Sequence, residues 1–167
     1  MTVTIRAARL EDLPQILDIT NDVIATSTAI YFDDPLTLEN RRQWLEDRQR
    51  LGYPVLVAEE VGDVLGFSSF GDFRPWPGYR FTVEHSLLVR DGHRGKGIGE
   101  ALVKALWPIA AKLGKHMIIA GVDAENRGSI RFHERLGFAM SAHLKEVGFK
   151  FGRRLDLVLL QRAIGEP

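Results

Sequence analysis

The stretch "LLVRDGHRGKGIGEAL", from Leu87 to Leu102, crowds four glycines into the eight positions from Gly92 to Gly99. Before it, "RFTVEHSLLV" has the composition of a long strand, and after it "IGEALVKALWPIAAKLG" has the apolar spacing of a helix. A turn from a strand into a helix leaves the first N–H groups of the helix without partners, and the helix dipole favours an anion there. The stretch therefore predicts an anion-binding loop.

Two common phosphate-binding motifs do not match this loop. A P-loop has a glycine where this chain has Arg90, and its Gly-Lys pair is followed by Ser or Thr rather than by Gly97. A dinucleotide-binding fingerprint needs a third glycine where Glu100 or Leu102 stands, and no βαβ unit opens the chain. Neither reading is therefore indicated by the residues.

The residues that remain suit a diphosphate. Gly95, Gly97 and Gly99 lack Cβ atoms, so the backbone can approach a ligand closely. Arg94 and Lys96 add positive charge, and the magnesium ligand that phosphoryl transfer requires is missing from the motif. We interpret the loop as a binding site for a diphosphate that is bound and not cleaved, such as a diphosphate through which a cofactor is held. The alternative is a turn that only reverses the chain.

Outward from the loop, the chain predicts a mixed α/β order. Thr37 is the expected N-cap of one helix, whose apolar positions are Leu38, Trp44, Leu45 and Leu51. Gly62 and Asp63 predict the turn of a hairpin, and three antiparallel strands are expected in a row around it. The expected helices are 10–24, 37–52, 98–114 and 127–137, and the expected strands are 3–8, 54–60, 63–73, 80–89, 116–122, 138–147 and 150–162.

Length and composition narrow the class of protein. A chain of 167 residues is expected to form one domain, 1–167. Lys plus Arg and Asp plus Glu number 22 each, so no overall charge favours nucleic acid or an anionic membrane. No apolar run approaches a membrane span, and the N-terminus lacks the build of a signal peptide, so a cytoplasmic location is expected. There is no cysteine, and the histidines lack zinc-ligand spacing, so no metal site is predicted.

With the loop and the element order in view, the chain resembles the GNAT superfamily of N-acetyltransferases. Residues Arg94 to Gly99 are similar to its Arg/Gln-x-x-Gly-x-Gly/Ala signature. The resemblance implies the GNAT fold, of class α/β (α+β), with a mixed, mostly antiparallel sheet of about seven strands and about four helices. It also implies acetyl-coenzyme A (acetyl-CoA) as the co-substrate, with its pantetheine arm paired to β-strand backbone. The cofactor-binding residues expected from it are Leu87, Leu88, Val89, Arg94, Gly95, Lys96, Gly97, Ile98, Gly99, Glu100 and Asn126.

Glu84 is the candidate general base. It lies three to five residues before the proposed pantetheine segment, which would put its carboxylate near the thioester. By alternation it shares a face with Thr82, Ser86 and Leu88, so it is either a solvent-facing strand residue or a carboxylate in a cleft. A semi-buried carboxylate has a raised pKa, which helps it to accept a proton from an amine. Ser86 has no convincing triad partners, so direct transfer in a ternary complex is expected.

His133 is the candidate acid. Many members of the superfamily have Tyr in the corresponding place of a "Y-E-x-L-G-F" segment, where it protonates the coenzyme A thiolate, and this chain reads "HERLGF". Two interpretations stay open, a proton donor and a helix histidine hydrogen-bonded in the core.

The segment "GDFRPWPGYRFTVEHS" concentrates aromatic and arginine side chains before Glu84. Such a set suits a small ligand with an apolar stem and a carboxylate, and the alternative is a surface loop with ordinary exposed arginines. The predicted substrate-binding residues are Phe73, Arg74, Trp76, Pro77, Gly78, Arg80, Glu84, His85 and Ser86.

The same segment, with "TSTAIYF", "LGYPVLVAEE" and "EVGFKFGRRLDLVLLQ", is similar to the phosphinothricin and methionine sulfoximine acetyltransferase branch. The resemblance implies N-acetylation of a small amino-acid analogue with a tetrahedral side-chain end, and a homodimer with the site near the subunit interface. Arg154 departs from the branch, whose members commonly have an aromatic there. Two alternatives remain: an acetyltransferase for another amine, such as an amino acid, polyamine or antibiotic, and a coenzyme A-binding module without catalysis.

Overall fold

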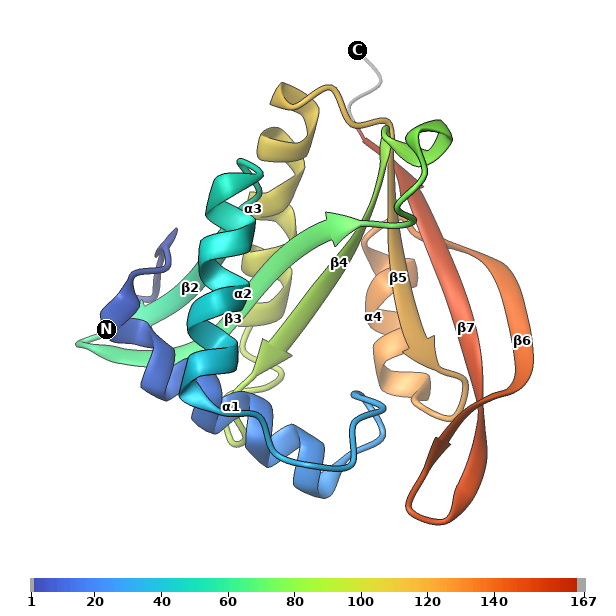
Figure 1. The fold of residues 1–167 in the computed structure, drawn as a ribbon, viewed down its shortest axis with the longest axis horizontal. Coiled ribbons are helices and arrows are strands. Elements are labelled where there is room, and N and C mark those ends of the chain that lie inside the picture. The colour runs from blue at the N-terminus through green and yellow to red at the C-terminus, as the bar shows by residue number, and fades with distance from the viewer. Residues whose placement is uncertain (1, 165–167) are drawn as a thin grey trace.

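The computed structural model describes residues 2–164, and these build one seven-stranded sheet with helices on both faces (Figure 1). The sheet order is β1-β2-β3-β4-β5-β7-β6, and every neighbouring pair is antiparallel except β4 and β5. The strands are β1 (Thr4–Ala7), β2 (Val55–Glu60), β3 (Asp63–Asp72), β4 (Thr82–Val89), β5 (Met117–Asp123), β6 (Ala139–Lys150) and β7 (Arg153–Ala163). The helices are α1 (Leu13–Thr26), α2 (Leu38–Arg50), α3 (Ile98–Lys112) and α4 (Arg127–Arg135), with short 3-10 turns η1 (Leu10–Asp12) and η2 (Pro77–Tyr79). The predicted order of elements and the mixed sheet are confirmed.

The sheet has a packed layer on each face. On one face, α3 covers a core that includes Leu102, Leu106 and Val83, all fully buried. On the other, α1 and α2 cover a smaller core around Ile16 and Leu45. Because side chains alternate along a strand, neighbours in β4 point into different layers. This alternation separates Glu84 from His85.

Strands β4 and β5 diverge along their length, as Figure 1 shows. They pair only over Thr82–Glu84 of β4 and Met117–Ile119 of β5. Beyond Glu84 the backbone of β4 keeps its partner β3 on one side and loses its partner on the other. The sheet is therefore opened into a V at its centre, and the unpaired side of β4 faces the opening.

The connection between α1 and α2 closes the open end of the V. The buried ammonium of Lys150, on β6, donates to the carbonyl oxygens of Ser27 and Ile30 at 2.6 and 2.7 Å. The hydroxyl of Tyr31 donates to the backbone of Asp156. This N-terminal segment is thus fastened to the two C-terminal strands.

Two details of the sequence prediction are wrong. Leu38 and Leu51 are about half exposed, because they lie at the two ends of α2, and the central Leu45 is the residue of this helix that is buried. The first hairpin turn consists of Val61 and Gly62, both with positive φ, and Asp63 already belongs to β3. Thr37 caps α2 as predicted by accepting from the backbone N–H of Asn40. No helix of residues 2–164 has the length and hydropathy needed to span a membrane.

Candidate active site

Two cavities meet at the V between β4 and β5. The loop cavity, about 640 Å³, lies along the glycine-rich loop, and the strand cavity, about 430 Å³, lies over the middle of β4. Both are lined by Leu87 and Leu88 of β4 and by Asn126 and Ser129 at the start of α4. A ligand that fills the loop cavity therefore reaches the strand cavity at the splayed part of the sheet.

The geometry of the loop cavity fits a diphosphate. Gly95 and Gly97 have φ of 75° and 82°, a conformation that suits glycine, and an added Cβ at either would meet no atom within 4 Å. Gly97 is the N-cap of α3, so the first N–H groups of this helix are presented to the cavity beside exposed Arg94. The unpaired side of β4 offers further backbone groups to an extended ligand. The residues present thus suit coenzyme A.

The predicted cofactor residues divide into two sets. Lys96 is exposed and Ile98 is buried in the α3 core, and neither lines the cavity. Asn126 caps α4 by accepting from the backbone N–H of Ser129, and it lies where the two cavities meet. The residues that line the loop cavity as expected are Leu87, Leu88, Val89, Arg94, Gly95, Gly97, Gly99, Glu100 and Asn126.

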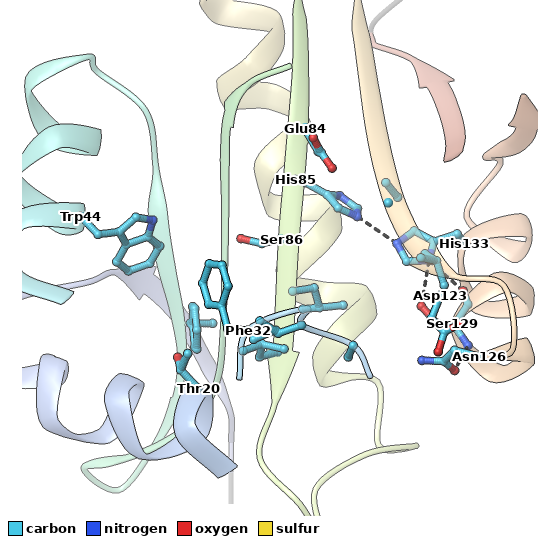
Figure 2. Close-up of a pocket in the computed structure, with 18 of the residues that line it drawn as sticks. Thr20, Phe32, Trp44, Glu84, His85, Ser86, Asp123, Asn126, Ser129 and His133 are labelled. Carbon is cyan, nitrogen blue, oxygen red and sulfur yellow. Dashed lines mark hydrogen bonds between the residues drawn. The ribbon is translucent and has the colours of Figure 1, made fainter. Parts of the chain in front are cut away.

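Glu84 lies half-buried in the strand cavity (Figure 2). Burial raises the pKa of its carboxyl group, and the positive charge of Arg74 opposes part of that rise. An added Cβ at Gly121 would lie 2.9 Å from Glu84 Oε1, so the glycine in β5 makes room for the carboxylate. Of the two interpretations offered by the sequence, the carboxylate in a cleft is confirmed.

His85 and His133 form a buried, hydrogen-bonded pair (Figure 2). By alternation along β4, His85 points to the opposite face of the sheet from Glu84. The carbonyl oxygen of Ser129 can only accept, so His133 Nδ1–H donates to it at 2.8 Å and leaves Nε2 as an acceptor. His85 Nε2–H then donates to His133 Nε2 at 2.9 Å. His85 Nδ1 carries no hydrogen in this arrangement and has no partner among residues 2–164.

The pair is held neutral. Burial, with a further contribution from His133, lowers the pKa of His85 to about 3. Burial also lowers the pKa of His133, although the hydrogen bond to Ser129 opposes it. His133 is hydrogen-bonded in the core, as one of the two interpretations has it, and it also lines the strand cavity, so its role as a proton donor stays a prediction.

The structure separates the predicted substrate residues. Glu84, His85 and Ser86 line the strand cavity. The other six, Phe73, Arg74, Trp76, Pro77, Gly78 and Arg80, belong to the β3–β4 connection and line neither cavity. In that connection Arg74 stacks on Phe73, Arg80 stacks on Phe81, and Trp76 is 63% exposed. Arg74 reaches the site only through its charge on Glu84.

Several cavity residues were not predicted from the sequence. Helix α2 contributes Arg41, Trp44 and Arg48, which recur at helical spacing on one face. Gly121 lines the strand cavity, and Gly71, outside it, lies against Arg48; both interrupt strands, a signal that another group approaches the backbone closely. The remaining lining residues that were missed are Thr20, Ala29, Ile30, Phe32, Leu36, Phe67, Ala120, Val122, Asp123 and Ser129 in the strand cavity, and Val23, Ser27, Gly128, Phe132 and Arg135 in the loop cavity. Within residues 2–164, His, Asp and Glu side chains form no cluster of three that could hold a metal ion.

Comparison with known proteins places this geometry in a family. The Acetyltransferase (GNAT) family profile matches residues 16–138. The L-methionine sulfoximine/L-methionine sulfone acetyltransferase of Pseudomonas aeruginosa is 48% identical over 96% of this chain and 94% of its own length. An L-amino acid N-acyltransferase of Escherichia coli is 43% identical over 98% of this chain and 95% of its own.

A solved structure agrees. The phosphinothricin acetyltransferase of Sinorhizobium meliloti, in complex with acetyl-CoA, superposes with a TM-score of 0.94 at 36% identity, covering 99% of this chain and 90% of that one. The splayed sheet, the glycine-rich loop at the start of α3 and these matches over nearly the whole length agree with one another. The chain belongs to the GNAT family of acetyltransferases.

Proposed function

We propose that this protein transfers the acetyl group of acetyl-CoA to the α-amino group of a small amino-acid analogue, such as L-methionine sulfoximine, L-methionine sulfone or phosphinothricin. The observation that carries the proposal is the position of Glu84, a half-buried carboxylate of raised pKa in a cavity that opens into the loop cavity. Residues 1–167 would act as one catalytic domain. The names of the relatives supply the class of acceptor.

The cofactor would be held by the residues of the loop cavity. Gly95, Gly97 and the first N–H groups of α3 would bind the diphosphate with the help of Arg94. At Leu87, Leu88 and Val89, the side of β4 that β5 leaves unpaired would hold the extended pantetheine arm. When bound, acetyl-CoA supplies the acetyl group as a thioester that a free amine can attack.

Glu84 would act as the general base. Its carboxylate would accept a proton from the acceptor's ammonium group, directly or through one water, and so expose the nitrogen lone pair. The raised pKa makes this proton transfer more favourable than it would be for an exposed glutamate. The missing Cβ of Gly121 leaves the carboxylate free to take up this position.

His133 would serve as the proton donor on the other side of the V. Its Nδ1–H points toward Ser129, whose hydroxyl oxygen is 3.4 Å from Nδ1 and whose side chain lies where the cavities meet. The hydrogen on Nδ1 would pass toward the leaving thiolate through that hydroxyl as the hydrogen of His85 Nε2 moves to His133 Nε2 and His85 Nδ1 takes up a proton, so that neither ring is left as an anion. His85 would keep the ring of His133 in the required tautomer.

The β3–β4 connection and the edge strand β6 are the parts that we assign to a homodimer. The connection exposes Trp76, and β6 exposes Val147 and Phe149 to more than half of their area. An edge strand with exposed apolar side chains favours association. In such a dimer, residues 73–80 would complete the acceptor site from the rim, as the sequence prediction has it.

The proposal is tested by free-thiol release from acetyl-CoA. The acceptors are L-methionine sulfoximine, L-methionine sulfone, L-phosphinothricin, the proteinogenic amino acids, spermidine and kanamycin. We expect turnover with the tetrahedral analogues, and a lower level with some proteinogenic amino acids. Turnover confined to spermidine or kanamycin would make the protein an acetyltransferase of another specificity. Binding of acetyl-CoA without turnover of any acceptor would make it a coenzyme A-binding module.

A further inference from the structure

One face of α2 lies over the strand cavity and carries two cations. Arg41, Trp44 and Arg48 line the cavity together. The indole of Trp44 packs edge-on against Phe67 of β3, with ring centroids 5.9 Å apart, and fixes the helix above the sheet. The guanidinium of Arg41 stacks on the same indole at 4.5 Å. Both arginines are thus held in place by the packing of α2.

The guanidinium of Arg48 lies flat against the backbone of β3 at Gly71. An added Cβ at Gly71 would be 1.9 Å from Nη1 and 2.7 Å from Cζ of Arg48, so only glycine leaves room for this arrangement. Gly71 is the cross-strand partner of Glu84. Directly paired residues in antiparallel strands present the same face of the sheet, with Cβ atoms about 5 Å apart. Arg48 therefore lies beside the proposed base, on the same face of the sheet.

Neither arginine has a counter-ion within residues 2–164. The ion pairs of this region use other residues, and Arg48 Nε is buried without any hydrogen-bond partner. Burial lowers the pKa of both guanidinium groups, and the charge of Arg48 lowers that of Arg41 further. Asp72 and Asp47 offset part of this cost at Arg48 through their charge alone. Arg41 donates to the neutral amide oxygen of Asn40, which supplies no compensating charge. A partly buried cation without a counter-ion is expensive, and an anionic ligand would relieve the cost.

The positions of Arg48 and Glu84 match the two ends of an α-amino acid. The carboxylate of Glu84 leans toward Gly121 of β5, whereas Arg48 lies over Gly71 of β3. Arg48, Glu84 and Gly121 all line the strand cavity. An α-amino acid carries its ammonium and carboxylate on one carbon, so both groups can be satisfied there at the same time.

We infer that Arg48, with Arg41 beside it, binds the α-carboxylate of the acceptor and thereby restricts the enzyme to amines that carry a neighbouring carboxylate. This inference rests on the proposed function, because it assumes that the amine reacts beside Glu84. It assigns the carboxylate to α2 rather than to Arg74 and Arg80 of the β3–β4 connection. Polyamines, amino-acid esters and the N-termini of peptides lack the required anion and are poor acceptors.

The test compares L-methionine sulfone with its methyl ester, using wild-type protein, Arg48→Gln and, as a matched control, Arg42→Gln on the exposed side of α2. We expect Arg48→Gln to lower kcat/KM for the acid by about 10- to 100-fold, mainly through KM, as expected for loss of a hydrogen bond to a charged group. The loss with the ester is much smaller, so the preference for the acid collapses. Arg42→Gln keeps the wild-type preference.

A second variant moves the guanidinium without removing its charge. Gly71→Ala places a Cβ where Arg48 now lies, and the flexible side chain can yield, so we expect a raised KM for the acid in a folded protein. An unchanged KM in Arg48→Gln, equal losses for acid and ester, or loss of the preference in Arg74→Gln alone would overturn the inference.

Failure of the proposed function gives a different result. If the wild type acetylates none of the acceptors, the proposed function is wrong. Binding of the α-carboxylate by Arg48 is then tested by ligand binding alone. L-methionine sulfone must then raise the thermal unfolding temperature of the wild type and not that of Arg48→Gln. Equal shifts of the unfolding temperature, or no shift in either protein, would also reject the binding of the α-carboxylate by Arg48.

Discussion

The ionisable side chains on the two faces of β4 lie in opposite environments, one that tolerates charge and one that keeps the group neutral. On the α2 face, Glu84 is half-buried in a cavity that also contains Arg41 and Arg48, which form no ion pair with any residue from 2 to 164. On the α3 and α4 face, His85 is 8% exposed and bonded to a second histidine, and both rings are neutral. The carboxylate is placed where its charged form is tolerated, whereas the two histidines, which line the same cavity, are kept neutral, although Glu84 and His85 are adjacent in the chain.

With the roles proposed for Glu84 and His133, one strand would serve two steps of a proton transfer. A carboxylate that must accept a proton needs a charged form that is accessible and only modestly destabilised. A histidine pair that must keep one tautomer needs fixed hydrogen bonds and no competing water. Alternation along β4 gives each group its own environment within one residue of the other.

The largest expected effect follows from the loss of Glu84, the proposed base. Replacing Glu84 with Gln keeps the shape and removes the proton acceptor, so we expect kcat to fall by about 10²- to 10⁴-fold with little change in KM. Glu60→Gln, a strand glutamate outside both cavities, is the matched control. Steady-state kinetics with L-methionine sulfone measures both, and a kcat for Glu84→Gln within tenfold of wild type would remove Glu84 from its proposed role.

The environment of His85 is tested through the pH dependence of the free energy of unfolding. The unfolded chain binds a proton at each histidine near pH 6.5, whereas the folded pKa of His85 is about 3. Stability from His85 is therefore complete above pH 6.5 and is lost as the pH falls toward 3. From pH 7 to pH 5 this amounts to about 2 kcal/mol.

Urea unfolding at the two pH values measures this loss. His85→Gln keeps a donor for His133 and removes the titrating group, so its stability is less dependent on pH by about the same 2 kcal/mol. His116→Gln, at an exposed histidine, keeps the wild-type dependence. Identical pH dependence in wild type and His85→Gln would mean that His85 is not held neutral.

The smallest expected effect is that of Arg74, in the β3–β4 connection, on the pKa of Glu84. Arg74 lowers the pKa of Glu84, so Arg74→Gln raises it further, and the acid limb of kcat/KM moves to higher pH. Arg80→Gln, in the same connection but bonded to the carbonyl oxygen of Pro77, leaves the position of the limb unchanged. A shift toward lower pH in Arg74→Gln would contradict the sign of this coupling.

The loop cavity was predictable from sequence because its residues are contiguous. Six consecutive residues, Arg94 to Gly99, carry the loop, and the strand and helix around it follow from ordinary periodicity. The strand cavity was only partly predictable, since Arg48, Gly71 and Gly121 come from three elements that a single sequence does not bring together. The β3–β4 connection attracted the substrate prediction by composition, yet its arginines stack on neighbouring aromatic rings.

The bond between Lys150 and the α1–α2 connection bears on the biosynthesis of the protein. Lys150 is 123 residues from Ser27 and 120 from Ile30, and Ala29 and Ile30 form part of the strand-cavity wall. Closing so long a loop is costly in chain entropy and slow. A nascent chain emerging from the ribosome therefore makes its glycine-rich loop before this wall, which is complete only after the final hairpin has been made.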